Sequence, residues 1–165
     1  MSKNFKFVIP ILICVGISLF VYGKYVRPAP KKSSVHLAWG SDLKAAIAKA
    51  AVSGKPIMVD FNAVWCGPCQ EYKEHVFDTQ EFGDEARKFE LVDVDVDQDR
   101  AVAASYGVDP IPDIWFLNSK GQPLSHVIGY DGSDLVLDMR KAFDDAKQPA
   151  PAKPLAKQAA NHCDS

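Results

Sequence analysis

Residues 57–69 read Ile-Met-Val-Asp-Phe-Asn-Ala-Val-Trp-Cys-Gly-Pro-Cys. The first five form a short apolar run, typical of a buried strand, that contains one acid, Asp60. A helix is predicted to begin near Cys66 and to run to about Phe77, because Pro68 suits the first turn of a helix. The sequence therefore predicts a strand that leads directly into a helix, with a pair of cysteines at the junction.

The two cysteines of this motif, Cys66 and Cys69, have the placement of a redox-active pair. At a helix N-terminus, unpaired backbone N–H groups and the positive end of the helix dipole stabilise the Cys66 thiolate over the thiol. Cys69 follows one helical turn later, close enough to form a disulfide with Cys66. We therefore expect Cys66 to attack a substrate disulfide and Cys69 to resolve the mixed disulfide that results.

Other interpretations of these residues stay open. A structural zinc site needs four ligands, but the sequence holds no second Cys-x-x-Cys pair and its four histidines are scattered. We therefore expect no metal and no cofactor, with a purely structural disulfide as the alternative to a redox pair. Asp60 lies within an apolar strand, which raises the pKa of a carboxyl group and lets it accept a proton near pH 7. The alternative for Asp60 is a hydrogen-bonded structural acid.

The rest of the central sequence alternates between helical and strand patterns. A first helix is expected to be capped by Ser41 and stopped by Gly54, and a last helix to be capped by Ser133. Further strands are predicted at 89–96, 114–117 and 124–128, and a short helix at 100–106. Alternation of this kind predicts an α/β sandwich with a mixed sheet.

The two ends of the chain differ from its centre in composition. We expect a basic leader at 1–6, an apolar segment at 7–23, a linker at 24–34, the folded domain at 35–146 and a disordered tail at 147–165. The apolar segment has 17 uncharged residues. As a helix it would span roughly 26 Å, just short of the roughly 30 Å of a hydrocarbon core. We expect a transmembrane anchor, with a cleaved signal segment as the alternative.

Formal charge is divided unevenly along the chain. It is +6 for residues 1–34, −10 for 35–146 and +2 for 147–165. An acidic body repels phosphate backbones, so the sequence argues against nucleic-acid binding. The basic N-terminal flank instead indicates attraction to a membrane surface.

Several short segments resemble the thioredoxin family. They are Val59-Asp60-Phe61, Trp65-Cys66-Gly67-Pro68-Cys69, Val94-Asp95-Val96-Asp97, Tyr106-Gly107-Val108, Ile111-Pro112 and Gly129. The resemblance implies a central mixed sheet flanked by helices, with Cys66 as the nucleophile and Cys69 as the resolving thiol. It also implies that Asp60 helps to move the proton of Cys69, and that Pro112 is a cis-proline facing the disulfide. The substrate-binding residues that it implies are Trp65, Gly67, Pro68, Ile111 and Pro112.

The sequence also departs from the thioredoxin pattern. Asn62 stands where an aromatic residue is usual, Asp113 where a threonine is usual, and Asp93 where a lysine is usual. Two interacting acids resist full ionisation, so Asp93 is expected to raise the pKa of Asp60 further. The helix after the motif lacks the bending proline of thioredoxin. In this it resembles the C-terminal domain of the thiol:disulfide interchange protein DsbD and small membrane-anchored thioredoxin-like proteins of bacterial envelopes.

The expected function is that of a membrane-tethered thiol–disulfide oxidoreductase of the cell inner membrane, with its thioredoxin-like domain on the periplasmic side. Expected partners are disulfide-containing envelope proteins, with apocytochromes c as one candidate, and a membrane protein that donates electrons. The Gly-Pro dipeptide between the cysteines resembles reducing members of the family. The alternatives are a soluble periplasmic protein after signal cleavage, a binding or assembly module without redox turnover, and a disulfide oxidase or isomerase.

Overall fold

A five-stranded mixed sheet forms the centre of the computed structural model, which describes residues 32–33, 35–130 and 134–148. Its strands are β1 (Trp39–Gly40), β2 (Ile57–Asn62), β3 (Glu90–Asp95), β4 (Asp113–Leu117) and β5 (Pro123–Ile128), in the spatial order β1-β3-β2-β4-β5. β1 and β2 pair parallel with β3, whereas β4 pairs antiparallel with β2 and β5. The predicted α/β fold with a mixed sheet is confirmed.

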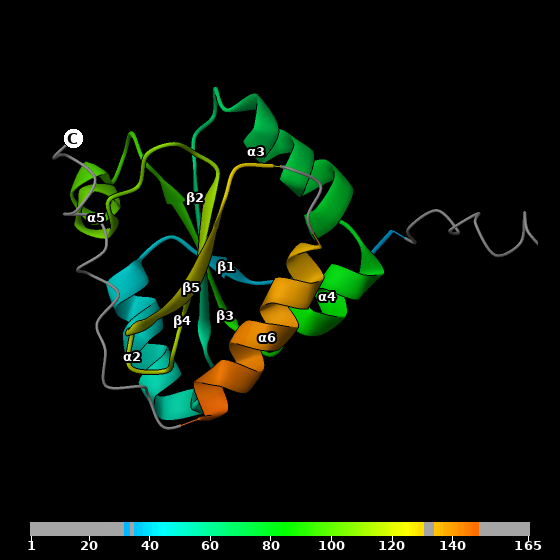
Figure 1. The fold of residues 1–165 in the computed structure, drawn as a ribbon, viewed down its shortest axis with the longest axis vertical. Helices are drawn as coiled ribbons and strands as arrows, with labels where there is room; N and C mark the ends of the chain where they lie inside the picture. The colour runs from blue at the N-terminus through cyan, green and yellow to red at the C-terminus, as the bar shows by residue number, and fades with distance from the viewer. Residues whose placement is uncertain (1–31, 34, 131–133, 149–165) are drawn as a thin grey trace, which may run out of the picture. The chain divides into compact units, whose positions relative to one another are not determined.

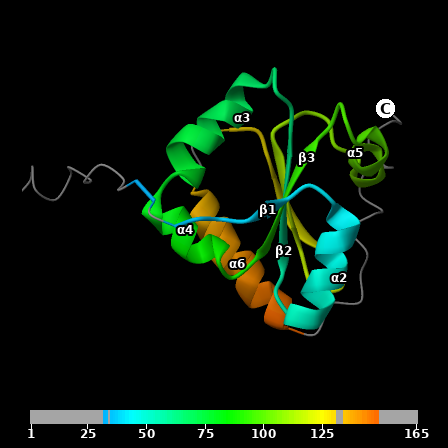
Figure 2. The same ribbon diagram turned by 180° about the vertical axis from the view of Figure 1, so that it is seen from behind.

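Helices cover both faces of this sheet (Figure 1 and, from behind, Figure 2). One face carries α2 (Leu43–Ser53) and α5 (Arg100–Tyr106). The other carries α3 (Gly67–Tyr72), α4 (Gln80–Ala86) and α6 (Leu135–Lys147). Each layer buries apolar side chains against the sheet, so two apolar clusters form, one on either side of it.

The central strand β2 is buried along its whole length, and its residues alternate between the two clusters. Val59 and Phe61 pack in the cluster beneath α2, whereas Met58 packs in the cluster that contains Tyr72 of α3. Asp60 follows Met58 by two residues in the same strand, so its side chain points to the same face of the sheet, toward α3. The pairing of β2 with β3 sets Asp60 opposite Asp93, which places both acids on that face.

Two predicted helix caps are wrong, each by one residue. The N-cap of α2 is Asp42 and not Ser41, because the Asp42 carboxylate accepts a hydrogen bond from Ala45 N at 3.0 Å. The N-cap of α6 is Asp134 and not Ser133, which lies outside the described residues. Gly54 ends α2 as predicted, with a φ of 74° that favours glycine.

The helix after the cysteines reaches Phe77, as predicted, but changes character on the way. After α3 the chain continues as η1 (Lys73–Phe77), a single π-helical turn. Two elements were not predicted, β1 and α4. β1 has only two residues, too few to show the alternation of apolar and polar residues that marks a strand. α4 is a seven-residue helix with a glycine inside it. Thr79 caps α4 by accepting a hydrogen bond from Phe82 N at 3.2 Å.

The last residues of the predicted linker are attached to the folded domain. Ser33 N donates to Asp78 O at 2.6 Å, Lys32 forms a β-bridge with Thr79, and the Lys32 ammonium lies 3.0 Å from the Asp78 carboxylate. Within the described part of the chain, no helix combines the length and the apolar character that crossing a membrane requires. The predicted anchor at 7–23 and all but the first two residues of the predicted tail lie outside the described residues.

Candidate active site

A disulfide joins Cys66 and Cys69 at the N-terminal end of α3, with the two Cα atoms 5.3 Å apart. Cys66 is the N-cap of the helix, and its Sγ accepts a hydrogen bond from Cys69 N at 3.2 Å. Both residues are buried in a small apolar cluster. Ala63 is the third buried member of this cluster, and the partly buried Val96 and Ile111 pack against it. The predicted pair is therefore joined and lies where a helix begins, as the strand-to-helix junction indicated.

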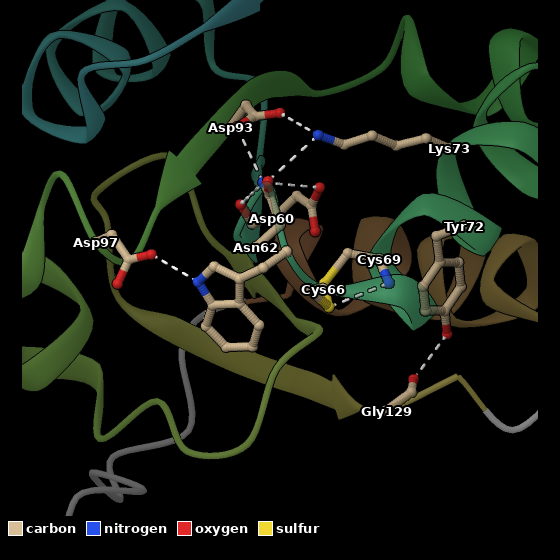
Figure 3. The surroundings of a disulfide bond; sticks show 10 residues. Asp60, Asn62, Cys66, Cys69, Tyr72, Lys73, Asp93, Asp97 and Gly129 are labelled. Carbon is tan, nitrogen blue, oxygen red and sulfur yellow. Dashed lines mark hydrogen bonds and ion pairs between the residues drawn. A yellow bond between two sulfur atoms is a disulfide. The ribbon is translucent and has the colours of Figure 1, made fainter.

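Apolar side chains project into solvent beside the disulfide. Val64 is exposed, and the Trp65 side chain has a relative exposure of 69%. The Trp65 indole is held in place because its Nε1 donates to Asp97 Oδ2 at 2.7 Å (Figure 3). Gly67 and Pro68 are also exposed, in the first turn of α3. The predicted contact residues next to the motif thus lie at the surface around the cysteines.

The loop before β4 contacts the cysteine cluster through Ile111. The Ile111–Pro112 peptide bond is cis, as the resemblance implied, and a second cis bond, Asp109–Pro110, was not predicted. Gly129 N donates to Pro112 O at 2.7 Å, and the Tyr72 hydroxyl donates to Gly129 O at 3.2 Å (Figure 3). These two hydrogen bonds tie the proline loop and the end of β5 to α3.

Asp60 is almost fully buried, with 2% relative exposure. Burial raises the pKa of the Asp60 carboxyl to about 7, and the neighbouring Asp93 carboxylate raises it as well. The Lys73 ammonium and a hydrogen bond from the Asn62 amide act in the opposite direction. Asp60 therefore gains and loses a proton near neutral pH, and the effect of Asp93 has the predicted sign.

Lys73 belongs to this site and was missed in the sequence. Its ammonium lies 3.1 Å from Asp93 Oδ2 and 3.3 Å from Asn62 Oδ1. A signal was present, because Lys73 follows Cys66 by seven residues and Cys69 by four, which helical spacing places on one side of the helix.

Asp113 lies directly after Pro112 but on the opposite face of the sheet from Asp60, because it pairs with Phe61 of β2. Its carboxylate accepts a hydrogen bond from Trp115 Nε1 at 2.8 Å and lies 3.0 Å from His126 Nδ1. Burial raises the pKa of the Asp113 carboxyl, while these two contacts act to lower it. The sequence indicated Asp113 only as an unusual residue; its partners come from β4 and β5.

Metal-ligating side chains do not gather in residues 32–33, 35–130 and 134–148. In these ranges no group of three or more His, Cys, Asp or Glu side chains could hold a metal ion.

Known proteins match this chain in sequence and in fold. Residues 38–119 match the family described as Thioredoxin-like. The thiol:disulfide interchange protein DsbD of Vibrio cholerae serotype O1 is 31% identical over 104 residues, which are 59% of this chain and 17% of that protein. Thioredoxin H-type of Oryza sativa subsp. indica is 34% identical over 97 residues, 57% of this chain and 74% of that protein. The solved structure of DsbH oxidoreductase has a TM-score of 0.57 at 20% identity, covering 72% of this chain and 90% of that one.

These matches differ in what they establish. The similarity to DsbH concerns the fold alone, and this chain spans only 17% of the length of DsbD. The rice thioredoxin is matched over most of its own length. Because that relative is 34% identical, and because the family match over residues 38–119 contains Cys66 and Cys69, the chain belongs to the thioredoxin-like family and is a thioredoxin-fold oxidoreductase.

Proposed function

We propose that this chain is a membrane-tethered oxidoreductase that reduces disulfide bonds in proteins of the bacterial envelope. The observation that carries the proposal is the Cys66–Cys69 disulfide at the start of α3, next to exposed Trp65 and in contact with Ile111, whose peptide bond to Pro112 is cis. A thiol pair that opens and closes at a helix N-terminus, next to exposed apolar surface, suits reaction with a second polypeptide.

The reaction needs only the two cysteines and one proton acceptor. The Cys66 thiolate attacks one sulfur of the substrate disulfide, and the other substrate sulfur leaves as a thiolate that takes a proton from water. Cys69 then loses its proton, with Asp60 as the acceptor, and attacks the Cys66 sulfur. The substrate is released with both sulfurs reduced. The chain has given up two electrons, and its two cysteines are now joined as the Cys66–Cys69 disulfide.

A dithiol donor must reduce that disulfide again before the next cycle. An oxidising envelope does not supply such a donor from solution, so we propose a membrane protein that passes on two electrons by thiol–disulfide exchange. The sequence similarity to the thiol:disulfide interchange protein DsbD supports exchange with other thiol proteins. Apocytochromes c are one class of envelope substrate that fits this chemistry.

The membrane attachment is proposed from sequence alone. The uncharged segment 7–23 lies between a basic leader and a second group of basic residues, a pattern that fits an N-terminal anchor. With this anchor in the inner membrane, the domain would lie on the periplasmic side.

The proposed substrates can be trapped covalently in cells. Changing Cys69→Ala removes the thiol that resolves the mixed disulfide, so substrates are expected to stay bound to Cys66. We expect discrete complexes, visible by non-reducing electrophoresis of the full chain and lost on reduction, that contain envelope proteins. The matched control, Cys66→Ser with Cys69→Ala, should trap none. Complexes made up only of cytoplasmic proteins, or none at all, would contradict the proposed function.

The reduction potential separates a reductase from an oxidase or isomerase. We expect the Cys66–Cys69 couple to lie closer to the roughly −270 mV of thioredoxin than to the roughly −120 mV of strong disulfide oxidants. Equilibration of the purified protein with glutathione or dithiothreitol buffers, followed by quantification of free thiols, measures it. A value between about −120 and −180 mV would favour the oxidase or isomerase instead.

A further inference from the structure

Three polar side chains, Asn62, Asp93 and Lys73, connect the buried Asp60 with the protein surface. The Asn62 amide nitrogen lies 3.3 Å from Asp60 Oδ2 and 2.9 Å from Asp93 Oδ1. The Lys73 ammonium lies 3.3 Å from the Asn62 amide oxygen and 3.1 Å from Asp93 Oδ2. Figure 3 shows Asn62 in the middle of this group, with Lys73 reaching in from the helix and Asp93 from β3.

Burial changes sharply along this group. Asp60 and Asn62 are both buried, whereas the side chains of Lys73 and Asp93 are 36% and 37% exposed. The Lys73–Asp93 ion pair therefore meets water, and the Asn62 amide is the contact between that pair and the buried acid. Every side-chain nitrogen and oxygen buried in the described residues has a hydrogen-bond partner, so the group is fully satisfied as it stands.

We infer that Asn62 and the Lys73–Asp93 pair form a polar bridge that controls how readily Asp60 accepts the Cys69 proton and passes it to water. The inference rests on the disulfide reduction proposed above, in which Asp60 takes that proton before Cys69 attacks Cys66. Asn62, Lys73 and Asp93 act through Asp60 and touch no reacting sulfur, so they are positioning residues.

Opposing charges on the bridge set the balance between the protonated and the ionised form of Asp60. The groups that act on Asp60 are Asp93 from β3, Lys73 from η1 and Asn62 from its own strand. A negative charge at Asp93 favours the protonated form of Asp60, and a positive charge at Lys73 favours the ionised form. Because Lys73 and Asp93 are partners, loss of either one leaves the other charge uncompensated beside Asp60.

Two charge-removing variants are expected to move the titration of Asp60 in opposite directions. We expect Lys73→Met to raise the Asp60 midpoint by about one pH unit and Asp93→Asn to lower it by about one unit. In the double variant, Asp60 should titrate close to its wild-type midpoint. Lys73→Arg keeps the positive charge, so it should also leave the Asp60 midpoint near the wild-type value. NMR of the Asp60 carboxyl carbon in the oxidised full-length protein measures these midpoints without any turnover.

A matched lysine elsewhere tests whether the effect is local. Lys88→Met removes the same charge from an ion pair with Glu85, away from the site, and should leave both the Asp60 midpoint and reductase activity unchanged. The pH at which single-turnover resolution reaches half its maximum should follow the Asp60 midpoint in each variant. Midpoints unchanged in both Lys73→Met and Asp93→Asn, or shifted equally by Lys88→Met, would overturn the inference. A wild-type protein that fails to reduce disulfides while the midpoints still shift would overturn the proposed function instead.

Discussion

Replacing Cys66 by serine is expected to abolish reduction of insulin disulfides by the purified protein. A hydroxyl group does not ionise near neutral pH and is a poor nucleophile toward sulfur, so the rate should fall by more than about a thousandfold. The precipitation of insulin chains in the presence of dithiothreitol measures the rate. The fold should survive, because serine is close to cysteine in size and can still accept the hydrogen bond from Cys69 N that caps α3.

A second cysteine supplies the matched control for this variant. Cys163 lies in the C-terminal tail, outside the described residues and far in sequence from the motif, so Cys163→Ser should keep the wild-type rate. Insulin reduction that persisted in Cys66→Ser would show that the first cysteine of the motif is not the nucleophile.

Replacing Asp60 by asparagine is expected to stabilise the folded protein at alkaline pH. The pKa of this carboxyl is about 7 in the folded protein against 3.8 for a free aspartate, so the folded state binds the proton more tightly than the unfolded state does. The stability of the wild type therefore falls as pH rises from about 4 to about 7, and levels off above that. The total loss is on the order of 4 kcal/mol, because each tenfold difference in proton affinity between the two states corresponds to about 1.4 kcal/mol.

An asparagine at position 60 carries no charge at any pH and avoids this loss. Guanidinium unfolding of the oxidised proteins should show Asp60→Asn more stable than wild type at pH 8.5, by up to about 4 kcal/mol, and nearly equal at pH 4. The exposed Asp144→Asn is the control and should show no such pH dependence. A gain of the same size at both pH values would contradict the assignment of a raised pKa to Asp60.

The extent to which sequence predicted the fold depended on the length of each element. β2 and β3 lie inside the sheet and have runs of six residues, long enough to show their burial pattern in the sequence. β1 has two residues and takes its conformation from pairing with Leu91 and Val92, which no local pattern can indicate. α4 is likewise short and depends on packing of Phe82 and Ala86 against the core.

The residues of the candidate site also differ in how far the sequence predicted them. Cys66, Cys69, Asp60 and their neighbours lie within ten residues, so a local motif identifies them. Lys73 contacts Asp93 only because sheet register and the helix after the motif bring positions twenty residues apart together. The pairing of Asp113 with His126 depends in the same way on the hairpin of β4 and β5.

The hydrogen bonds from Tyr72 to Gly129 and from Gly129 to Pro112 have a consequence for molecular recognition. They cross-link the two segments that flank the disulfide before any other molecule arrives. A docking polypeptide therefore does not have to immobilise either segment, and the configurational entropy lost on association falls mainly on the incoming chain. Preorganisation of this kind lowers the free-energy cost of association on the side of this chain.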